Sequence, residues 1–88
     1  MEVLEIKTRE LEFGIWEVSV VGTLDWTNFS QVEERLGEVF EQKVYRIVVN
    51  LAEAKYISSA GFGSFISSLD TATKHGGDIV FTHTPTEI

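Results

Sequence analysis

Apolar and polar residues alternate in the first part of the chain, which is the pattern of strands with one buried face. The alternation is imperfect over residues 3–8 and clearer over 15–21, where β-branched and aromatic residues are frequent. Gly14, a turn residue, lies between these two segments. The pattern therefore predicts a hairpin of two antiparallel strands.

After the segment 22–25, which breaks the strand pattern, the apolar residues are mostly three or four positions apart. This is the spacing of one face of a helix. Thr27 is the expected N-cap of this helix, and Ser30 with Glu33 offers a capping box as an alternative start. The apolar residues of the helix are Phe29, Val32, Leu36, Val39 and Phe40.

Three further elements are expected in the second half of the chain. Residues 45–51 form a short apolar run with polar flanks, which is the profile of a buried central strand. A helix is expected from about 60 to 75, and Gly76-Gly77 should end it before a last strand at 78–82. The apolar stripe of this second helix consists of Phe62, Phe65, Ile66, Leu69 and Thr73.

Strands that alternate with helices are joined by parallel crossovers, so the order of elements predicts one α/β domain over 1–88. We expect a mostly parallel sheet of about four strands with the helices packed mainly on one face. Thr84 and Pro85 suit the start of another helix, which the chain would need residues beyond Ile88 to complete. We therefore expect a C-terminally truncated domain, whose uncovered apolar sheet face would favour a homodimer.

Composition and charge narrow the classes of function. The chain has 88 residues and no cysteine, which excludes disulfides and thiolate chemistry and suits a reducing cytoplasm. The net charge is −7 and the seven basic residues are scattered, so the chain lacks the basic stripe of a nucleic-acid-binding protein. No apolar stretch reaches the roughly 18 residues of a membrane span, so direct membrane insertion is not expected.

The most unusual segment is 56–69, which has no charged residue in a chain that is 24% charged. In a purely structural interpretation, Ser58 or Ser59 caps the second helix and Gly61 allows close packing. In a functional interpretation, a serine at this helix N-terminus carries a phosphate, because free backbone N–H groups and the positive end of the helix dipole favour an anion. The residues alone leave both interpretations open.

Four other residues also have both an ordinary and a functional interpretation. Asp25 is either a turn residue or part of a partner-binding surface, and Thr27 is either only a cap or a neighbour of that surface. Trp26 follows Asp25 in a loop, which makes it a better interface candidate than Trp16, although tryptophan is usually a packing residue. Phe62 lies one turn from the serines and is either part of the core or partly exposed.

Catalytic and metal-binding residues are not expected. His75 and His83 are the only histidines, and neither has a metal-ligand spacing with carboxylates. The serines lack a Gly-x-Ser-x-Gly elbow and an obvious histidine base. We therefore expect a binding protein and not an enzyme, with no metal site.

Three motifs, in order along the chain, resemble those of the STAS domain family, the fold of bacterial anti-sigma factor antagonists. Residues 22–25 (GTLD) with Thr27 resemble the family's Gly-Glu-Leu-Asp…Thr motif. Residues 50–62 (NLAEAKYISSAGF) resemble a strand that ends Asp-Leu, followed by Asp-Ser-Ser-Gly-Leu or Ser-Ser-Ala-Gly-Leu. The glycine pair before the last core strand completes the resemblance. Asn50 and Ser58 replace carboxylates of the family pattern.

The resemblance implies a STAS-like sheet and a regulatory cycle. Ser59 is at the position that a partner serine kinase, often the anti-sigma factor itself, phosphorylates in the family. The unmodified chain would bind the anti-sigma factor and release the sigma factor, and a phosphatase would reset the switch. No cofactor is implied, because ATP and magnesium belong to the kinase. The implied docking surface consists of Asp25, Trp26, Thr27, Ser58, Ser59, Gly61 and Phe62.

Two alternatives from other classes remain. The chain could be a constitutive STAS scaffold or adaptor, in a stress-signalling complex or as a component of a lipid or anion transporter, in which Ser59 is never phosphorylated. It could also be a small enzyme that uses Ser59 covalently, which labelling by a serine-reactive phosphonate would reveal.

Overall fold

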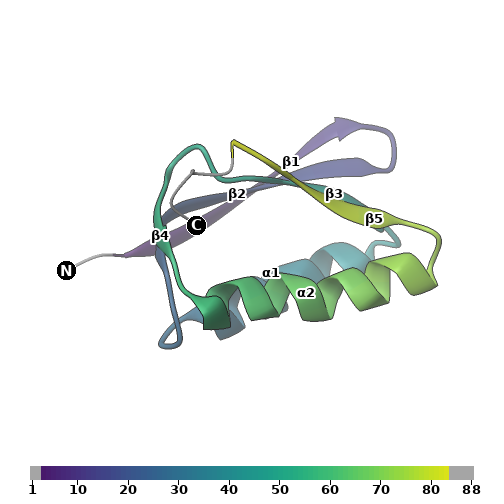
Figure 1. Cartoon of the computed structure of the whole chain (residues 1–88). Helices are drawn as coiled ribbons and strands as arrows, with labels where there is room; N and C mark the ends of the chain where they lie inside the picture. The colour runs from purple at the N-terminus through teal and green to yellow at the C-terminus, as the bar shows by residue number, and fades with distance from the viewer. Residues whose placement is uncertain (1–2, 84–88) are drawn as a thin grey trace.

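The computed structural model of the chain describes residues 3–83, in which five strands form one sheet and two helices cover one of its faces (Figure 1). This confirms the predicted mostly parallel α/β sheet, with one strand more than expected. In chain order the elements are β1 (Leu4–Glu12), β2 (Ile15–Leu24), α1 (Phe29–Glu41), β3 (Arg46–Asn50), β4 (Ala54–Ile57), α2 (Ser59–Lys74) and β5 (Asp78–Thr82).

The strand order explains how the functional segments come together. The sheet runs β1-β2-β3-β5, with β1 antiparallel to β2 and the other pairs parallel. Residues 15–19 of β2 pair with β3, and residues 22–24 pair with β4. Two successive strands therefore share one side of β2, and the end of β4 lies beside the end of β2.

The additional strand, β4, is not predicted by the sequence pattern. It is four residues long, and only Ile57 among them is buried. A segment this short and this exposed has no apolar alternation from which a strand can be predicted. It is a strand because β2 continues past β3 and offers unpaired backbone groups there.

β2 also extends beyond its predicted end, through a glycine that continues the strand. Gly22 has φ +96°, and a Cβ atom at this position would collide with the backbone carbonyl of Val3, the residue before β1. Its N–H donates to Glu53 O at 3.1 Å. Glycine is required here because it tolerates both the positive φ and the close approach of β1.

The first helix begins one residue later than the predicted cap implied. Asn28 is at the N-cap position and α1 starts at Phe29, so the prediction of Thr27 as the cap is wrong. The alternative capping box of Ser30 and Glu33 is also wrong, because both residues lie inside the helix. The predicted apolar face is confirmed, with Val32, Leu36 and Val39 buried against the sheet.

The second helix buries serines in addition to apolar residues. Ser64 Oγ donates to Gly61 O at 2.6 Å and Ser68 Oγ donates to Ser64 O at 2.9 Å, so both hydroxyls are satisfied within the helix. Ile66, which was assigned to the apolar stripe, is instead 61% exposed. The predicted helical start at Thr84 and Pro85 lies outside the described residues.

Candidate functional site

The ends of β2 and β4 place two strand-to-helix connections next to each other. Leu24 pairs with Ile57 in the parallel register, and the Ser58 N–H donates to Leu24 O at 2.9 Å. The chain leaves β2 into the loop 25–28 before α1, and it leaves β4 directly into α2. Both transitions therefore lie at the same end of the molecule (Figure 1).

The loop 25–28 is held by side-chain hydrogen bonds. Asp25 Oδ1 accepts from the Thr27 backbone N–H at 2.9 Å and from Thr27 Oγ1 at 2.5 Å. Asn28 Oδ1 accepts from the Asp25 N–H, and Asn28 Nδ2 donates to Thr23 O, both at 2.9 Å. The sequence analysis missed Asn28, although asparagine next to an aspartate turn is a common signal for such bonds.

These bonds also set the charge of the loop. The Thr27 hydroxyl, followed by the Thr27 backbone N–H, lowers the pKa of Asp25 below its ordinary value of 3.8. Both groups donate to the carboxylate form and stabilise it. The loop therefore carries a fixed negative charge near neutral pH, and Thr27 is a partner of Asp25 instead of a helix cap.

Trp26 is the most prominent apolar residue of this loop. Its side chain is 74% exposed, and its neighbour Thr27 is also exposed. The bonds of Asp25, Thr27 and Asn28 hold the backbone on either side of it. A large indole presented to solvent by an ordered loop has the properties of an interface anchor.

The two serines at the start of α2 have different environments. Ser58 is the N-cap, and its Oγ accepts from the Gly61 N–H at 3.2 Å, which confirms the predicted capping by one of the two serines. Ser59 is the first helical residue and is exposed. Within residues 3–83, its hydroxyl has no hydrogen-bond partner. Ser59 is therefore the serine whose hydroxyl is available for modification.

Gly61 and Phe62 lie beneath this surface. Gly61 is buried, and a Cβ atom there would lie 2.7 Å from Leu24 Cγ. Phe62 is half-buried, with its ring 5.9 Å from that of Phe81 in an edge-to-face arrangement. Both residues support the position of α2 on the sheet. A direct role for them in partner binding stays a prediction.

Two apolar residues of the segment 56–69 are exposed, which the sequence analysis did not predict. Tyr56, from β4, is 57% exposed, and Ile66 lies about two turns beyond Ser59 on α2. The uncharged run 56–69 contained both residues, but its composition could not show which of its side chains face solvent. Exposure of one β4 residue and one α2 residue follows from the packing of these elements on β2.

The site does not have the arrangement of a serine hydrolase. His75 is at the opposite end of α2, a helix of 16 residues and so about 24 Å long. His83 makes no hydrogen bond with Ser59 among the described residues. Over 3–83, no group of three or more acidic or histidine side chains could hold a metal ion. Of the helices in the same range, none has the length and apolar character for crossing a membrane.

Comparison with known proteins relates this geometry to a family. The family model described as STAS domain matches residues 8–88. An anti-sigma factor antagonist from Mycobacterium paratuberculosis is similar with a TM-score of 0.79 and 20% identity, over 97% of this chain and 73% of that one. SpoIIAA in its unphosphorylated form is similar with a TM-score of 0.78 and 16% identity, over 94% of this chain and 77% of that one.

A third solved structure is that of the Bacillus cell fate determinant SpoIIAA in its phosphorylated form. It is similar with a TM-score of 0.79 and 14% identity, over 94% of this chain and 76% of that one. At these identities the likeness concerns the fold. A search of curated proteins found no match to this chain.

Proposed function

Because this chain belongs to the STAS domain family, we propose that it acts as an anti-sigma factor antagonist that is switched by phosphorylation of Ser59. The observation that carries the proposal is the difference between the environments of the two serines. Ser58 is used as the cap of α2, and the Ser59 hydroxyl is exposed beside it. A kinase can therefore modify Ser59 without removing the bond that starts the helix.

The position of Ser59 also suits a phosphate. The first turn of a helix presents backbone N–H groups and the positive end of the helix dipole, which stabilise an anion. A phosphate adds roughly −1.5 to −2 charges at neutral pH. These charges would be added next to the loop that carries Asp25 and Trp26. The switch would work by charge and bulk at the docking surface, while the fold stays the same.

The docking surface proposed for the unmodified protein includes Asp25, Trp26, Thr27, Ser58 and Ser59, with Gly61 and Phe62 beneath or beside it. The partners are an anti-sigma factor with serine kinase activity and a phosphatase. The chain itself is a cytoplasmic binding module, and ATP is used by the kinase.

Intact-mass spectrometry tests the modification. The chain is incubated with ATP and a lysate of its native host, whose kinase activity is checked on a control STAS protein. We expect one added phosphate on the wild type and on Ser67→Ala, a matched exposed serine of α2, and none on Ser59→Ala. Modification of Ser59→Ala, or no modification of the wild type, would contradict the proposal and favour a constitutive scaffold.

Binding to the isolated anti-sigma factor tests the switch. Ser59→Ala should retain the affinity of the wild type, because the hydroxyl is small and makes no bond within residues 3–83. Ser59→Asp should bind more weakly, although less so than the phosphorylated chain, since it carries fewer charges than a phosphate. An affinity of Ser59→Asp equal to that of wild type would count against switching by charge.

A further inference from the structure

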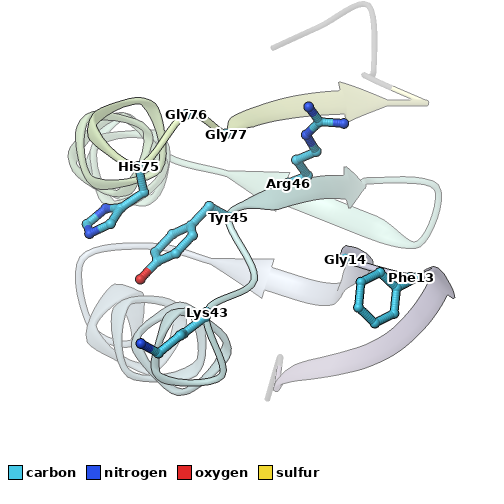
Figure 2. A pocket seen from close by; sticks show the side chains of 8 residues that line it. All are labelled: Phe13, Gly14, Lys43, Tyr45, Arg46, His75, Gly76 and Gly77. Carbon is cyan, nitrogen blue, oxygen red and sulfur yellow. The ribbon is translucent and has the colours of Figure 1, made fainter.

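A second candidate surface is the outer edge of β1, on the side that faces away from β2. β1 forms one edge of the sheet and β5 the other, and Phe13 and Gly14 lie at the turn that joins β1 to β2 (Figure 2). Over residues 3–83, no strand pairs with this outer side, although β1 is nine residues long. An edge strand presents a row of unpaired backbone N–H and C=O groups, to which another strand can add. The proposed switch does not use this edge.

The edge carries both signs of charge on one face of the sheet. Glu5, Lys7 and Arg9 lie opposite residues of β2 that alternate with its buried residues, so these three side chains are on the open face, away from the helices. Arg9 is already paired with Glu17 of β2 at 3.1 Å. Glu5 and Lys7 are exposed, and within residues 3–83 neither forms a salt bridge. One negative and one positive charge are therefore available at the edge.

The other face of the same strand has an apolar residue that is incompletely covered. Ile6 lies opposite the buried Val20, and so on the side of the helices, but it is only half-buried. An open hollow of about 190 Å³ lies between this side chain and α1. The residues of α1 that line the hollow are Gln31, Glu34, Arg35 and Glu38. An apolar side chain from a partner at this edge can therefore pack against Ile6.

A second copy of this chain matches the edge in one antiparallel register. When a strand pairs with its own copy about a two-fold axis, the residue on the axis faces itself, and residues before it face residues after it. With Ile6 on the axis, Glu5 of each copy faces Lys7 of the other, and the two Ile6 side chains meet beside the hollow. This pairing covers residues 3–9, which end before the irregularity between Glu10 and Glu12 of β1.

The registers centred on the other positions from 5 to 9 place like charges opposite each other. With Glu5, Lys7 or Arg9 on the axis, that charge faces its own copy. With Thr8 on the axis, Lys7 of each copy faces Arg9 of the other. Like charges directly opposite each other are destabilising, whereas opposite charges there are stabilising. The charges that usually protect an edge strand from pairing therefore exclude these registers and favour the one centred on Ile6.

We propose that this chain forms a homodimer by antiparallel pairing of its two β1 strands, with the two-fold axis at Ile6. This surface differs from the apolar sheet face through which the sequence analysis expected a homodimer. The dimer has one continuous sheet, with the helices of both copies on the same face. β1 begins beside Gly22, near the end of β2 that leads to the proposed switch. Because the axis reverses the direction of β1, the two Ser59 residues lie at opposite ends of the dimer, and both stay accessible.

The test is sedimentation equilibrium of the full chain at concentrations up to about 1 mM, where we expect reversible dimerisation of the wild type. Glu5→Lys and Lys7→Glu should each dimerise at least about tenfold more weakly, because each change turns two attractive pairs into two repulsive ones. A mixture of the two variants should form a heterodimer with about the affinity of the wild type, since each charge at the edge again faces an opposite charge. The heterodimer also shows that both variants are folded.

Two control variants make the test specific. Glu41→Lys, at an exposed position at the end of α1, changes the net charge as much as Glu5→Lys does and should leave dimerisation unchanged. Val80→Asp places a charge in β5, where the side chain is 46% exposed, and should also leave it unchanged. A monomeric wild type, equal losses in Glu5→Lys and Glu41→Lys, or a mixture that stays monomeric would overturn the proposal. Loss of the dimer in Val80→Asp but not in Glu5→Lys would overturn it in favour of contact through β5 or the open face.

Discussion

The start of α2 shows how one backbone position separates two chemically identical side chains. Ser58 has extended backbone angles, so its Oγ turns back to the Gly61 N–H, whereas Ser59 is already helical and its side chain is exposed. The Ser58 hydroxyl is therefore used in the helix cap, and the Ser59 hydroxyl is left exposed. Substitution of Ser58 and substitution of Ser59 should therefore have different effects on the free energy of unfolding.

Ser58→Ala should lower the free energy of unfolding by about 1 kcal/mol, because it leaves the Gly61 N–H without its cap. Ser59→Ala should change it by less than about 0.5 kcal/mol, since an exposed hydroxyl without a partner contributes little. Urea denaturation of the two variants beside the wild type measures both. A larger loss in Ser59→Ala than in Ser58→Ala would contradict the assignment of the cap.

Asp25 contributes to stability in a pH-dependent way. Because its pKa in the folded state lies below the ordinary 3.8, the folded protein holds the carboxylate form more strongly than the unfolded chain does. The stabilisation is present above this ordinary value and is lost as the pH falls through the folded-state pKa. The group is exposed, so the effect is small and is screened by salt.

Asp25→Asn, which keeps an acceptor oxygen but removes the charge, tests this contribution. The wild type should have the higher urea midpoint from about pH 7 to pH 5, and the difference should shrink below about pH 4. Thr27→Val should remove most of the same pH dependence, because the Thr27 hydroxyl is its main cause. A difference between wild type and Asp25→Asn that is unchanged at about pH 3 would show that the charge of Asp25 has no part in it.

At the scale of elements, the site depends on how closely α2 approaches the end of β2. Gly61 is the point of contact, because only a residue without a side chain fits against Leu24 and Ile57. Gly63 lies two residues later, on nearly the opposite side of the helix, and has open space around it. Substitution of the two glycines should therefore change the stability in opposite directions, although they are only two positions apart in the sequence.

Gly61→Ala should destabilise the protein by about 1–3 kcal/mol, because the added methyl group overpacks a fully buried Leu24. Gly63→Ala should instead stabilise it by about 0.5–1 kcal/mol, since alanine is the better helix former at an unhindered position. Thermal or urea unfolding of both variants gives the comparison. Similar effects of the same sign would mean that α2 is not packed as closely as described.

At the scale of the whole molecule, the proposed switch requires no change in the packing of the helices on the sheet. The two strand-to-helix connections at one end follow β2 and its neighbour β4. In β2, Val18, Val20 and Leu24 are fully buried between the sheet and the helices. The last turns of both helices lie at the other end of the molecule (Figure 1). A charge on Ser59 should therefore change the surface at one end and leave the other end as it is.

Ser59→Asp should keep the unfolding free energy within about 1 kcal/mol of that of the neutral Ser59→Asn. The attraction of the helix N-terminus, worth about 0.3–1 kcal/mol, is opposed by the overall negative charge. Amide chemical shifts should differ near Ser59 and in the loop 25–28, and they should be unchanged around His75. Widespread shifts or a loss of several kcal/mol would indicate a switch that works by changing the fold.

The sequence by itself determined those features that depend on neighbouring residues. Apolar spacing predicted α1, α2, β1, most of β2, β3 and β5, because burial on one face leaves a period in the chain. The local signals at α2 also predicted a serine cap and a glycine end, which the structure has at Ser58 and Gly76. The motifs around Asp25 and Ser59 could be identified for the same reason, since the residues of each motif are close together in the sequence.

Only the tertiary structure decided the features that depend on distant segments. β4 is a strand because β2, which is distant in the sequence, continues beside it. The direction of each α2 side chain was also decided by packing, which turns Ser64 inward and Ile66 outward. Burial depends on contacts between elements, and the composition of an uncharged segment does not indicate which of its faces packs against the sheet.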